Sequence, residues 1–500
     1  MTPTQSGDDE ARDARIDEVV ARILSRQAQA LSSTAGQDRS GDAGAMEREA
    51  RAATRRVDTS ASDRADISEV EYRQVRLERV VLVGLRTTQS EEEAENSLRE
   101  LAALAETAGS RVMDGVIQRR SLPDPATYLG SGKAKELADI VRAHEADTVI
   151  VDEELAPSQR RGLEDVVDAK VVDRTALILD IFAQHAKSRE GKAQVEFAQL
   201  EYLLPRLRGW GESMSRQAGG RVAGGAGIGS RGPGETKIEL DRRRIRARMA
   251  KLKAEIARME PARRTQRGAR RRGGVPSVAI AGYTNAGKST LLNRLTDAGV
   301  LVEDALFATL DPTVRRARTA DGREYTLTDT VGFVRNLPTQ LVEAFRSTLE
   351  EVGAADVLLH VVDAAHPDPV SQVEAVRAVL SGIEGADRVP ELIALNKADL
   401  ATPEQLAVLR TAFPGSVALS AKTGYGVGTL RAALEDLLPR PSVLIDVVIP
   451  YSAGSLVHRV HEEGEVEREE YAAEGTRLVA RVDEALAAAV RAATASRADE

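Results

Sequence analysis

Gly282-Tyr283-Thr284-Asn285-Ala286-Gly287-Lys288-Ser289 decides the fold of this chain, because it fits the pattern G-x-x-x-x-G-K-[ST]. The apolar run Val275–Ala281 before it predicts a buried strand, and Thr290–Leu295 after it predicts the start of a helix. Glycines let such a loop curl until its N–H groups converge on a phosphate, and the helix N-terminus adds a positive dipole. We therefore predict a P-loop in which Lys288 reaches the β- and γ-phosphate oxygens and Ser289 ligates Mg²⁺.

Composition and charge restrict the class of protein. The chain has 500 residues, enough for about three domains, and a net charge of −9. It has no cysteine, so disulfides and thiolate metal sites are excluded, and it has no apolar run near the ~20 residues that span a bilayer. The N-terminus lacks the apolar core of a signal peptide. We expect a cytoplasmic monomer without a membrane span.

The charge is distributed unevenly. Residues Arg206–Arg272 contain 20 Lys/Arg against 6 Asp/Glu, an excess of 14 positive charges in an acidic protein. A local excess of this size is typical of a surface that binds polyphosphate such as RNA.

The pattern along the chain predicts a multidomain α/β protein. We expect a P-loop domain with a mixed, mostly parallel sheet and helices on both faces, preceded by an α/β domain with a long helical hairpin and followed by a small α+β domain. The hairpin is predicted because Ile245, Met249, Leu252, Ile256 and Met259 repeat at helical spacing. The expected boundaries are 1–75 for a disordered or partly helical extension, 76–187 for the α/β subdomain, 188–272 for the basic antiparallel hairpin, 275–438 for the P-loop domain and 443–500 for the C-terminal domain.

The connection between the two arms of the hairpin is far longer than the 2–8 residues that usually join two helices. It is rich in Gly, Arg and Ser, and we expect it to be a functional tip that orders on RNA or a ribosomal surface, rather than a plain flexible connector. The candidate RNA-binding residues there are Trp210, Arg216, Arg221 and Arg231. A shorter basic stretch, Arg263–Arg272, is expected to connect the hairpin to the P-loop domain.

Three downstream motifs indicate the nucleotide. Asp329, Thr330, Val331 and Gly332 follow a predicted strand, so that Asp329 holds Mg²⁺ through water and the Gly332 N–H bonds the γ-phosphate. Asn396, Lys397, Ala398 and Asp399 end another apolar strand. The Asp399 carboxylate accepts from guanine N1–H and N2–H₂, a donor pair that adenine lacks, and this predicts GTP over ATP. Ser420, Ala421 and Lys422 offer backbone N–H groups to guanine O6.

A nucleotide-sensing threonine is expected between Leu301 and Val314, where Thr309 and Thr313 both qualify. We favour Thr309 as the second direct Mg²⁺ ligand, with a carbonyl that orients the water, so the candidate catalytic residues are Lys288, Thr309 and Gly332. The segment that carries it adds Phe307, Ala308, Thr309, Leu310 and Asp311 to the nucleotide site. Phe333 stands where Ras-like proteins have the water-orienting glutamine, which predicts slow hydrolysis that a partner accelerates.

These motifs together resemble the HflX family of ribosome-associated GTPases. The resemblance rests on Gly282–Thr290, Leu306–Thr313 and Asp329–Phe333, and on two motifs outside the P-loop domain, Tyr128–Lys133 and Gly229–Thr236. It implies GTP-dependent binding to the large ribosomal subunit (50S) and its rRNA, and splitting of stalled or idle 70S ribosomes. Asn285, three residues before Lys288, is similar to the asparagine that supports a K⁺ ion in place of an arginine finger in cation-dependent translational GTPases. The alternative is an ordinary loop hydrogen bond.

Two other functions remain open at this stage. One is a large-subunit assembly GTPase, which has the same chemistry on a precursor particle. The other is an ATP-dependent RNA helicase that uses the half-motif Gly130–Lys133, which lacks the full P-loop spacing and equally fits a structural turn or an RNA contact. The six histidines show no metal-ligand spacing.

Overall fold

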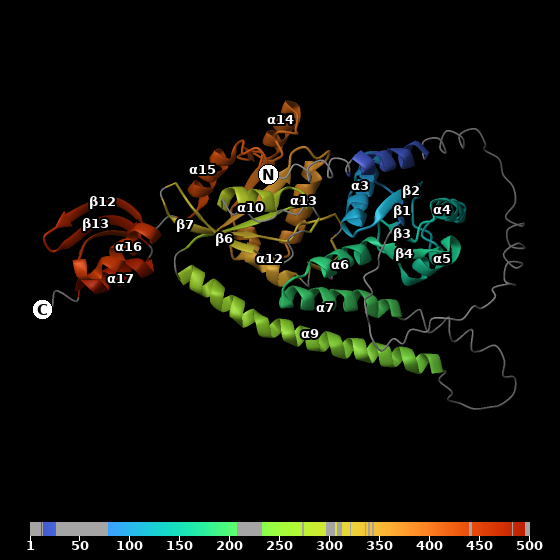
Figure 1. Ribbon diagram of the computed structural model, residues 1–500, viewed down its shortest axis with the longest axis horizontal. Coiled ribbons are helices and arrows are strands. Elements are labelled where there is room, and N and C mark those ends of the chain that lie inside the picture. Colours follow the sequence, from blue (N-terminus) through green and yellow to red (C-terminus); the bar gives the residue numbers. More distant parts are fainter. Residues whose placement is uncertain are drawn as a thin grey trace, which may run out of the picture. The chain divides into compact units, whose positions relative to one another are not determined.

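Figure 1 gives the arrangement of the chain in the computed structural model. The residues it describes are 12, 14–26, 79–207, 233–272, 275–296, 306–307, 313–320, 322–335, 337–338, 341–342, 345–439, 443–482 and 484–495. The chain divides into two units, Met1–Asp180 and Ile181–Glu500. The multidomain α/β architecture expected from the sequence is confirmed.

The first unit is built on a parallel sheet of four strands in the order β2-β1-β3-β4. Its elements are β1 (Arg79–Arg86), α3 (Glu91–Thr107), β2 (Arg111–Arg119), α4 (Ser131–His144), β3 (Thr148–Val151), α5 (Pro157–Val167) and β4 (Lys170–Asp173), and α6 (Arg174–His185) follows. Helices α4 and α5 pack on one face of the sheet, and α3 covers the other. Because both faces are covered, β1 and β3 are almost continuously apolar.

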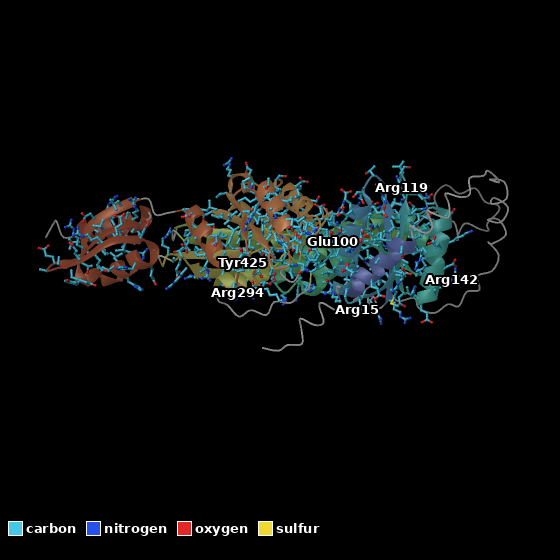
Figure 2. All side chains as sticks on the ribbon, turned by 90° about the horizontal axis from the view of Figure 1, so that it is seen from above. Arg15, Glu100, Arg119, Arg142, Arg294 and Tyr425 are labelled. Atoms are coloured by element: carbon cyan, nitrogen blue, oxygen red, sulfur yellow. The ribbon has the colours of Figure 1, made fainter. Side chains whose placement is uncertain are left out.

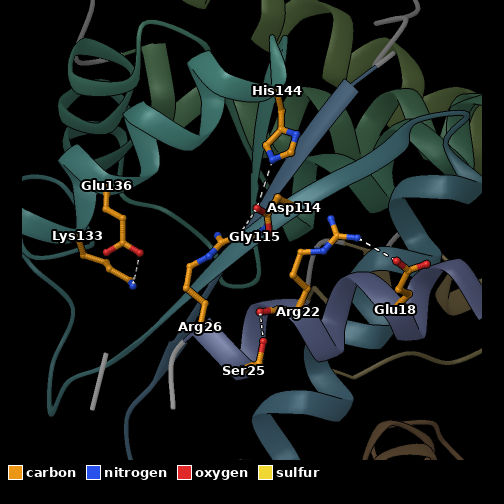
Figure 3. Close-up of polar contacts among 9 residues, drawn as sticks. All are labelled: Glu18, Arg22, Ser25, Arg26, Asp114, Gly115, Lys133, Glu136 and His144. Atoms are coloured by element: carbon orange, nitrogen blue, oxygen red, sulfur yellow. Dashed lines mark hydrogen bonds and ion pairs between the residues drawn. The ribbon is translucent and has the colours of Figure 1, made fainter. Parts of the chain in front are cut away.

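A helix within residues 14–26 packs against this sheet, in the segment where the sequence indicated only a possible short helix. Val20 and Ile23 are buried, and Ile23 lies over Gly115 of β2, where a Cβ would be only 2.7 Å from its Cδ1. Arg26 pairs with Asp114 at 2.6 Å, and Asp114 also contacts His144 Nε2 at 3.3 Å (Figure 3). This packing is invisible in the local sequence, because the groups that receive the helix lie about 90 residues away.

The second unit begins within the last turns of α6 at Ile181 and continues with the predicted antiparallel hairpin of α7 (Arg189–Arg206) and α9 (Pro233–Arg272). Two ion pairs between the helices reflect their antiparallel course. Arg189, at the start of α7, pairs with Glu255 of α9, and Glu196, seven residues later in α7, pairs with Arg248, seven residues earlier in α9. Between the helices lies a small apolar cluster formed by Ala193, Phe197, Leu200, Ile245, Met249, Leu252 and Ile256. The basic stretch Arg263–Arg272, which was expected to connect the hairpin to the P-loop domain, is helical and continues α9.

The P-loop domain contains a six-stranded sheet in the order β10-β9-β8-β5-β7-β6, parallel except for β6 against β7. Its strands are β5 (Ser277–Gly282), β6 (Thr313–Arg318), β7 (Glu324–Asp329), β8 (Val357–Asp363), β9 (Glu391–Asn396) and β10 (Val417–Ala418). Its helices are α10 (Lys288–Thr296), α12 (Arg346–Gly353), α13 (Pro369–Leu380), η2 (Ala386–Arg388), α14 (Pro403–Ala412) and α15 (Val427–Leu437). Helices α10 and α15 cover one face, and α12, α13 and α14 cover the other.

The C-terminal domain is a three-stranded antiparallel sheet, β11-β13-β12, with two helices on one face. Its elements are β11 (Val443–Ile449), η3 (Tyr451–Ala453), α16 (Gly454–Glu463), β12 (Glu465–Ala472), β13 (Gly475–Val482) and α17 (Glu484–Ala495). The sequence predicted a small α+β domain here but gave no signal for β12. This edge strand reads Glu-Val-Glu-Arg-Glu-Glu-Tyr-Ala, is largely exposed and therefore lacks the apolar alternation that marks a strand.

Candidate nucleotide site

The loop after β5 has the curled backbone that the P-loop pattern predicts. Three of its residues have positive φ: Gly282 at 152°, Asn285 at 58° and Gly287 at 89°. A Cβ on Gly282 would overlap the carbonyl of Val361 in β8, and one on Gly287 would overlap the Asn396 side chain. The two glycines are therefore required by conformation and by space.

Lys288, the first residue of α10, points back into this loop. Its side chain is buried, and Nζ donates to the Tyr283 carbonyl at 2.9 Å. Burial lowers the pKa of Lys288 to about 8, although the nearby Asp329 carboxylate acts in the opposite direction. Gly332 lies against the same group, since a Cβ there would be 3.1 Å from Nζ and 2.8 Å from Thr284 Cγ2.

Ser289 and Asp329 come together because β5 and β7 are parallel neighbours, with Ile280 opposite Asp329. The Ser289 hydroxyl donates to Asp329 Oδ2 at 2.8 Å. Thr330 turns its hydroxyl to the Ile280 carbonyl at 2.7 Å, which fixes the end of β7 against the loop. A hydroxyl and a carboxylate at one edge of the sheet are the hard oxygen donors that suit Mg²⁺, so the residues present fit that ion.

The Asn396–Asp399 motif is joined to the loop by one side chain. Asn396 donates from Nδ2 to the Ala286 carbonyl at 2.7 Å and accepts the Ala421 N–H at 2.9 Å. It thus holds three motifs together, with one partner 110 residues before it and the other 25 residues after it. Asp399 itself is exposed at the rim.

Lys397 and Ala398 complete the turn after β9. Lys397 has a φ of 60° and pairs with Asp363 at 2.7 Å. The N–H of Ala398 donates to Leu419 at 3.0 Å. Within the third motif, the Ser420 hydroxyl accepts the N–H of Thr423 at 3.1 Å, and Lys422 is exposed.

Arg294 of α10 is a site residue that sequence reasoning missed (it is labelled in Figure 2). It donates from Nε to the Ala421 carbonyl at 3.1 Å and from its terminal nitrogen to the Lys422 carbonyl at 2.6 Å. These bonds orient the backbone of the Ser420–Lys422 motif. The one indication of this role in the sequence is that Arg294 lies on the helix that follows the loop. Its acceptors could not be identified from the sequence, because they lie 127 and 128 residues away.

The segment expected to carry the sensing threonine is described in part. Leu306 and Phe307 are buried, and Thr313 is the first residue of β6. Ala308, Thr309, Leu310 and Asp311 lie outside the described residues, as do the tip residues Trp210, Arg216, Arg221 and Arg231.

Phe333 does not contribute a polar group at the position after Gly332. Its ring is buried in an apolar cluster with Tyr283, Leu349 and Val352. Its backbone forms a parallel bridge to the loop, because its carbonyl accepts from Thr284 at 2.7 Å and its N–H donates to Gly282 at 3.2 Å. Phe333 is therefore a structural link between the loop and the segment after β7.

The half-motif Gly130–Lys133 has a different geometry. Gly130 is the N-cap of α4 with extended backbone, and its N–H donates to Gln118 Oε1 at 2.8 Å. Lys133 pairs with Glu136 one turn later at 2.8 Å (Figure 3). Across the part of the chain that the structure describes, no group of three His, Asp or Glu residues could hold a metal ion.

Comparison with known proteins agrees with this site. Three family models match in succession: "GTP-binding GTPase N-terminal" over residues 95–183, "GTP-binding GTPase Middle Region" over 185–270 and "50S ribosome-binding GTPase" over 277–397. GTPase HflX of Lacrimispora saccharolytica is 46% identical over 399 residues, which cover 80% of this chain and 92% of that protein. The chain belongs to the HflX family of GTPases.

Two further HflX proteins show the same extent of similarity. That of Caldanaerobacter subterraneus is 45% identical, covering 81% of this chain and 91% of its own length. That of Escherichia coli is 43% identical, covering 78% and 90% respectively. The family resemblance inferred from the sequence motifs is confirmed, and this HflX family member is a GTP-binding protein that hydrolyses GTP. Among its described helices none combines the length and apolarity needed to cross a bilayer.

Proposed function

We propose that this HflX family member is a cytoplasmic factor that binds the 50S subunit in its GTP state and separates stalled or idle 70S ribosomes. The observation that carries the proposal is the basic outer face of α9. This helix contains 15 Lys/Arg against 5 Asp/Glu, in a chain whose net charge is −9. The family model described as "50S ribosome-binding GTPase" also matches the P-loop domain.

The basic residues of α9 are available to a partner. Ile245, Met249, Leu252 and Ile256 pack toward α7, so the opposite side of the helix faces solvent. The exposed basic side chains of α9, apart from Arg248, which pairs with Glu196 of α7, are Arg243, Arg244, Arg246, Lys251, Lys253 and Arg258. A row of cations on a rigid helix favours contact with RNA phosphates and makes binding fall steeply with salt. We propose that the tip residues Trp210, Arg216, Arg221 and Arg231 add stacking and phosphate contacts to rRNA.

The nucleotide roles follow from the site. Lys288 holds the β- and γ-phosphates, the Gly332 N–H bonds the γ-phosphate, and the Thr309 carbonyl orients the attacking water. Asp399 reads guanine N1–H and N2–H₂, while the N–H groups of the Ser420–Lys422 motif face guanine O6. The support is the convergence of Lys288, Gly332 and Asn396 on one loop.

Two cations belong to this proposal. Ser289 and Thr309 would bind Mg²⁺ directly, and Asp329 would bind it through water. When bound, the ion would neutralise negative charge on the phosphates. Asn285, exposed in the loop with a φ of 58°, would support K⁺. Hydrolysis at equal rates in K⁺ and Na⁺ buffers would contradict the second assignment.

Because Phe333 is buried and apolar, we propose that hydrolysis is slow in the isolated chain and is stimulated by ribosomes. A rate that is fast in pure protein and unchanged by 50S subunits would refute this.

Sucrose-gradient profiles of 70S ribosomes with the protein and a non-hydrolysable GTP analogue test the main proposal. We expect conversion of 70S particles to subunits. The triple variant Arg243→Glu, Arg244→Glu, Arg246→Glu should lose this effect while its basal GTP hydrolysis is retained. A charge-matched control reverses three exposed arginines elsewhere, Arg388, Arg410 and Arg491, and should split ribosomes normally.

The outcomes distinguish the other functions. Migration with precursor 50S particles alone would indicate an assembly factor. Duplex unwinding that depends on ATP would indicate a helicase. Unimpaired splitting by the α9 variant would remove the basic face from the mechanism.

A further inference from the structure

Three of the six phenylalanines in the chain meet at one point of the second unit. The ring centroid of Phe182 lies 4.5 Å from that of Phe307 and 4.9 Å from that of Phe345, with interplanar angles of 50° and 43°. Phe182 has no exposed surface, and the other two rings are 3% exposed. We call these three residues the phenylalanine cluster.

The two partners of Phe182 come from the two segments that flank the nucleotide site. Phe307 stands two residues before Thr309 in the sequence. Phe345 ends the segment that follows Asp329–Phe333 and lies just before α12, where its carbonyl accepts the Leu349 N–H at 2.9 Å. Each segment therefore contributes one ring to the same contact.

Phe307 needs this contact more than an ordinary buried residue does. Its φ is 61°, in the left-handed region that side chains other than glycine rarely adopt. Such a conformation persists only where the surroundings hold it, and for Phe307 the surroundings include the Phe182 ring. Loss of that ring would leave the Phe307 backbone free to relax.

Phe182 itself belongs to the helical middle of the chain. It lies in the last turn of α6, and only the short connection 186–188 separates α6 from α7, the first arm of the hairpin. The His185 ring bonds the Ile181 carbonyl at 2.8 Å, and Ser188 caps α7, so this connection is structured. The phenylalanine cluster thus connects α6, which leads directly into α7, to Phe307.

We propose that Phe182 is a positioning residue for GTP hydrolysis, which acts by holding Phe307, two residues before Thr309 in the sequence. It makes the geometry of the γ-phosphate site depend on the helical hairpin. The proposal rests on the proposed role of Thr309. It concerns the γ-phosphate alone, so binding of GDP should not depend on Phe182.

The test compares Phe182→Leu with Phe413→Leu in the full-length chain. Phe413 is a buried phenylalanine of the same unit that packs in a different cluster, so it controls for simple loss of a core ring. For Phe182→Leu we expect a roughly tenfold lower single-turnover rate with GTP, a change in KM of less than threefold and unaltered GDP affinity. Phe413→Leu should lower the melting temperature without lowering the single-turnover rate.

A double-mutant cycle with Phe307→Leu examines whether the two rings act together. If Phe182 acts through Phe307, the double variant is no slower than Phe307→Leu alone. Additive losses, or a Phe182→Leu rate equal to that of Phe413→Leu, would overturn the proposal. The variant Thr309→Ala distinguishes failure of the proposed role of Thr309 from failure of the role of Phe182. A normal hydrolysis rate in Thr309→Ala contradicts the role of Thr309. A slow rate in Thr309→Ala together with a normal rate in Phe182→Leu contradicts only the role of Phe182.

Discussion

Two Gly-Lys turns lead into helices that pack on the two α/β sheets of this molecule, and only one has the geometry of a phosphate loop. The Gly282–Ser289 loop follows β5 directly, has three positive φ angles and buries its lysine. The Gly130–Lys133 turn starts α4 from an extended Gly130 whose N–H already donates to Gln118. The first glycine lies six positions before the lysine in the first turn and three before it in the second. The longer spacing is what allows the first backbone to encircle a phosphate, whereas the second only caps a helix.

The largest expected effect is that of removing each lysine. Lys288→Ala should reduce GTP hydrolysis by about 10³-fold, because the group that neutralises the phosphates is lost. Lys133→Ala should change it by less than about twofold, since Lys133 pairs with Glu136 on the surface of α4. Steady-state phosphate release and titration with a fluorescent GTP analogue measure both. A comparable loss in Lys133→Ala would show that the second turn also handles nucleotide.

The next largest effect concerns recognition of the guanine base, which the P-loop does not contact. Asp399→Asn should weaken GTP binding by about 100-fold, the loss of about two charge-assisted hydrogen bonds. It should strengthen binding of xanthosine triphosphate, whose C2 carbonyl can accept from the new amide. Competition binding with both nucleotides measures the exchange. Weakened binding of both nucleotides, without a gain for xanthosine triphosphate, would contradict the assignment of Asp399.

Alanine at one glycine of each turn gives a smaller effect. Gly287→Ala must fit a Cβ at a φ of 89° against the Asn396 amide, so we expect GTP affinity to fall about tenfold and stability by about 1–3 kcal/mol. Gly132→Ala meets no described heavy atom within 4 Å and lies in α4, so it should stabilise by up to about 1 kcal/mol. Thermal unfolding and nucleotide titration of both variants provide the comparison. Equal tolerance at both positions would mean that the loop backbone can adjust.

The P-loop could be predicted from the sequence because its chemistry is local. Glycine spacing, one lysine and one hydroxyl determine it within eight residues, and the strand and helix beside it are equally local. The contacts that assemble the site are not local. Asn396 bonds Ala286 across 110 residues, and Arg294 bonds Lys422 across 128. No periodicity or motif carries the identity of such partners.

Elements whose positions depend on polar contacts could not be predicted from the sequence either. The helix at residues 14–26 is amphipathic in its sequence, but its position depends on Asp114 and on the space above Gly115. Strand β12 was missed because its side chains are charged on an exposed edge. Sequence patterns predict which residues are buried. They do not predict the ion pair that places the helix at 14–26 or the pairing with β13 that forms β12.

The smallest expected effect is a difference between the two sheets in how their stability depends on pH. Glu391 of β9 is half-buried, which raises its pKa, but hydrogen bonds from His360 and Arg377 outweigh burial and lower the pKa to about 2. Burial raises the pKa of Asp152 after β3, despite its contacts with Arg174 and Ser97. A lowered folded-state pKa stabilises above the unfolded value near 4.5, and the benefit is lost as pH falls toward 2. A raised pKa has the opposite sign, so protonation of Asp152 favours its folded sheet.

Glu391→Gln should therefore destabilise the P-loop sheet by roughly 1–2 kcal/mol at pH 7, and its deficit relative to wild type should shrink as pH falls below about 4.5. Asp152→Asn should show the reverse trend, with wild type gaining on the variant as pH falls. Urea-dependent hydrogen exchange, followed separately on peptides of β9 and β3, measures each sheet in the intact chain. Parallel slopes for the two variants would mean that the buried carboxylates of the two sheets do not differ in protonation, and the electrostatic part of the comparison would fail.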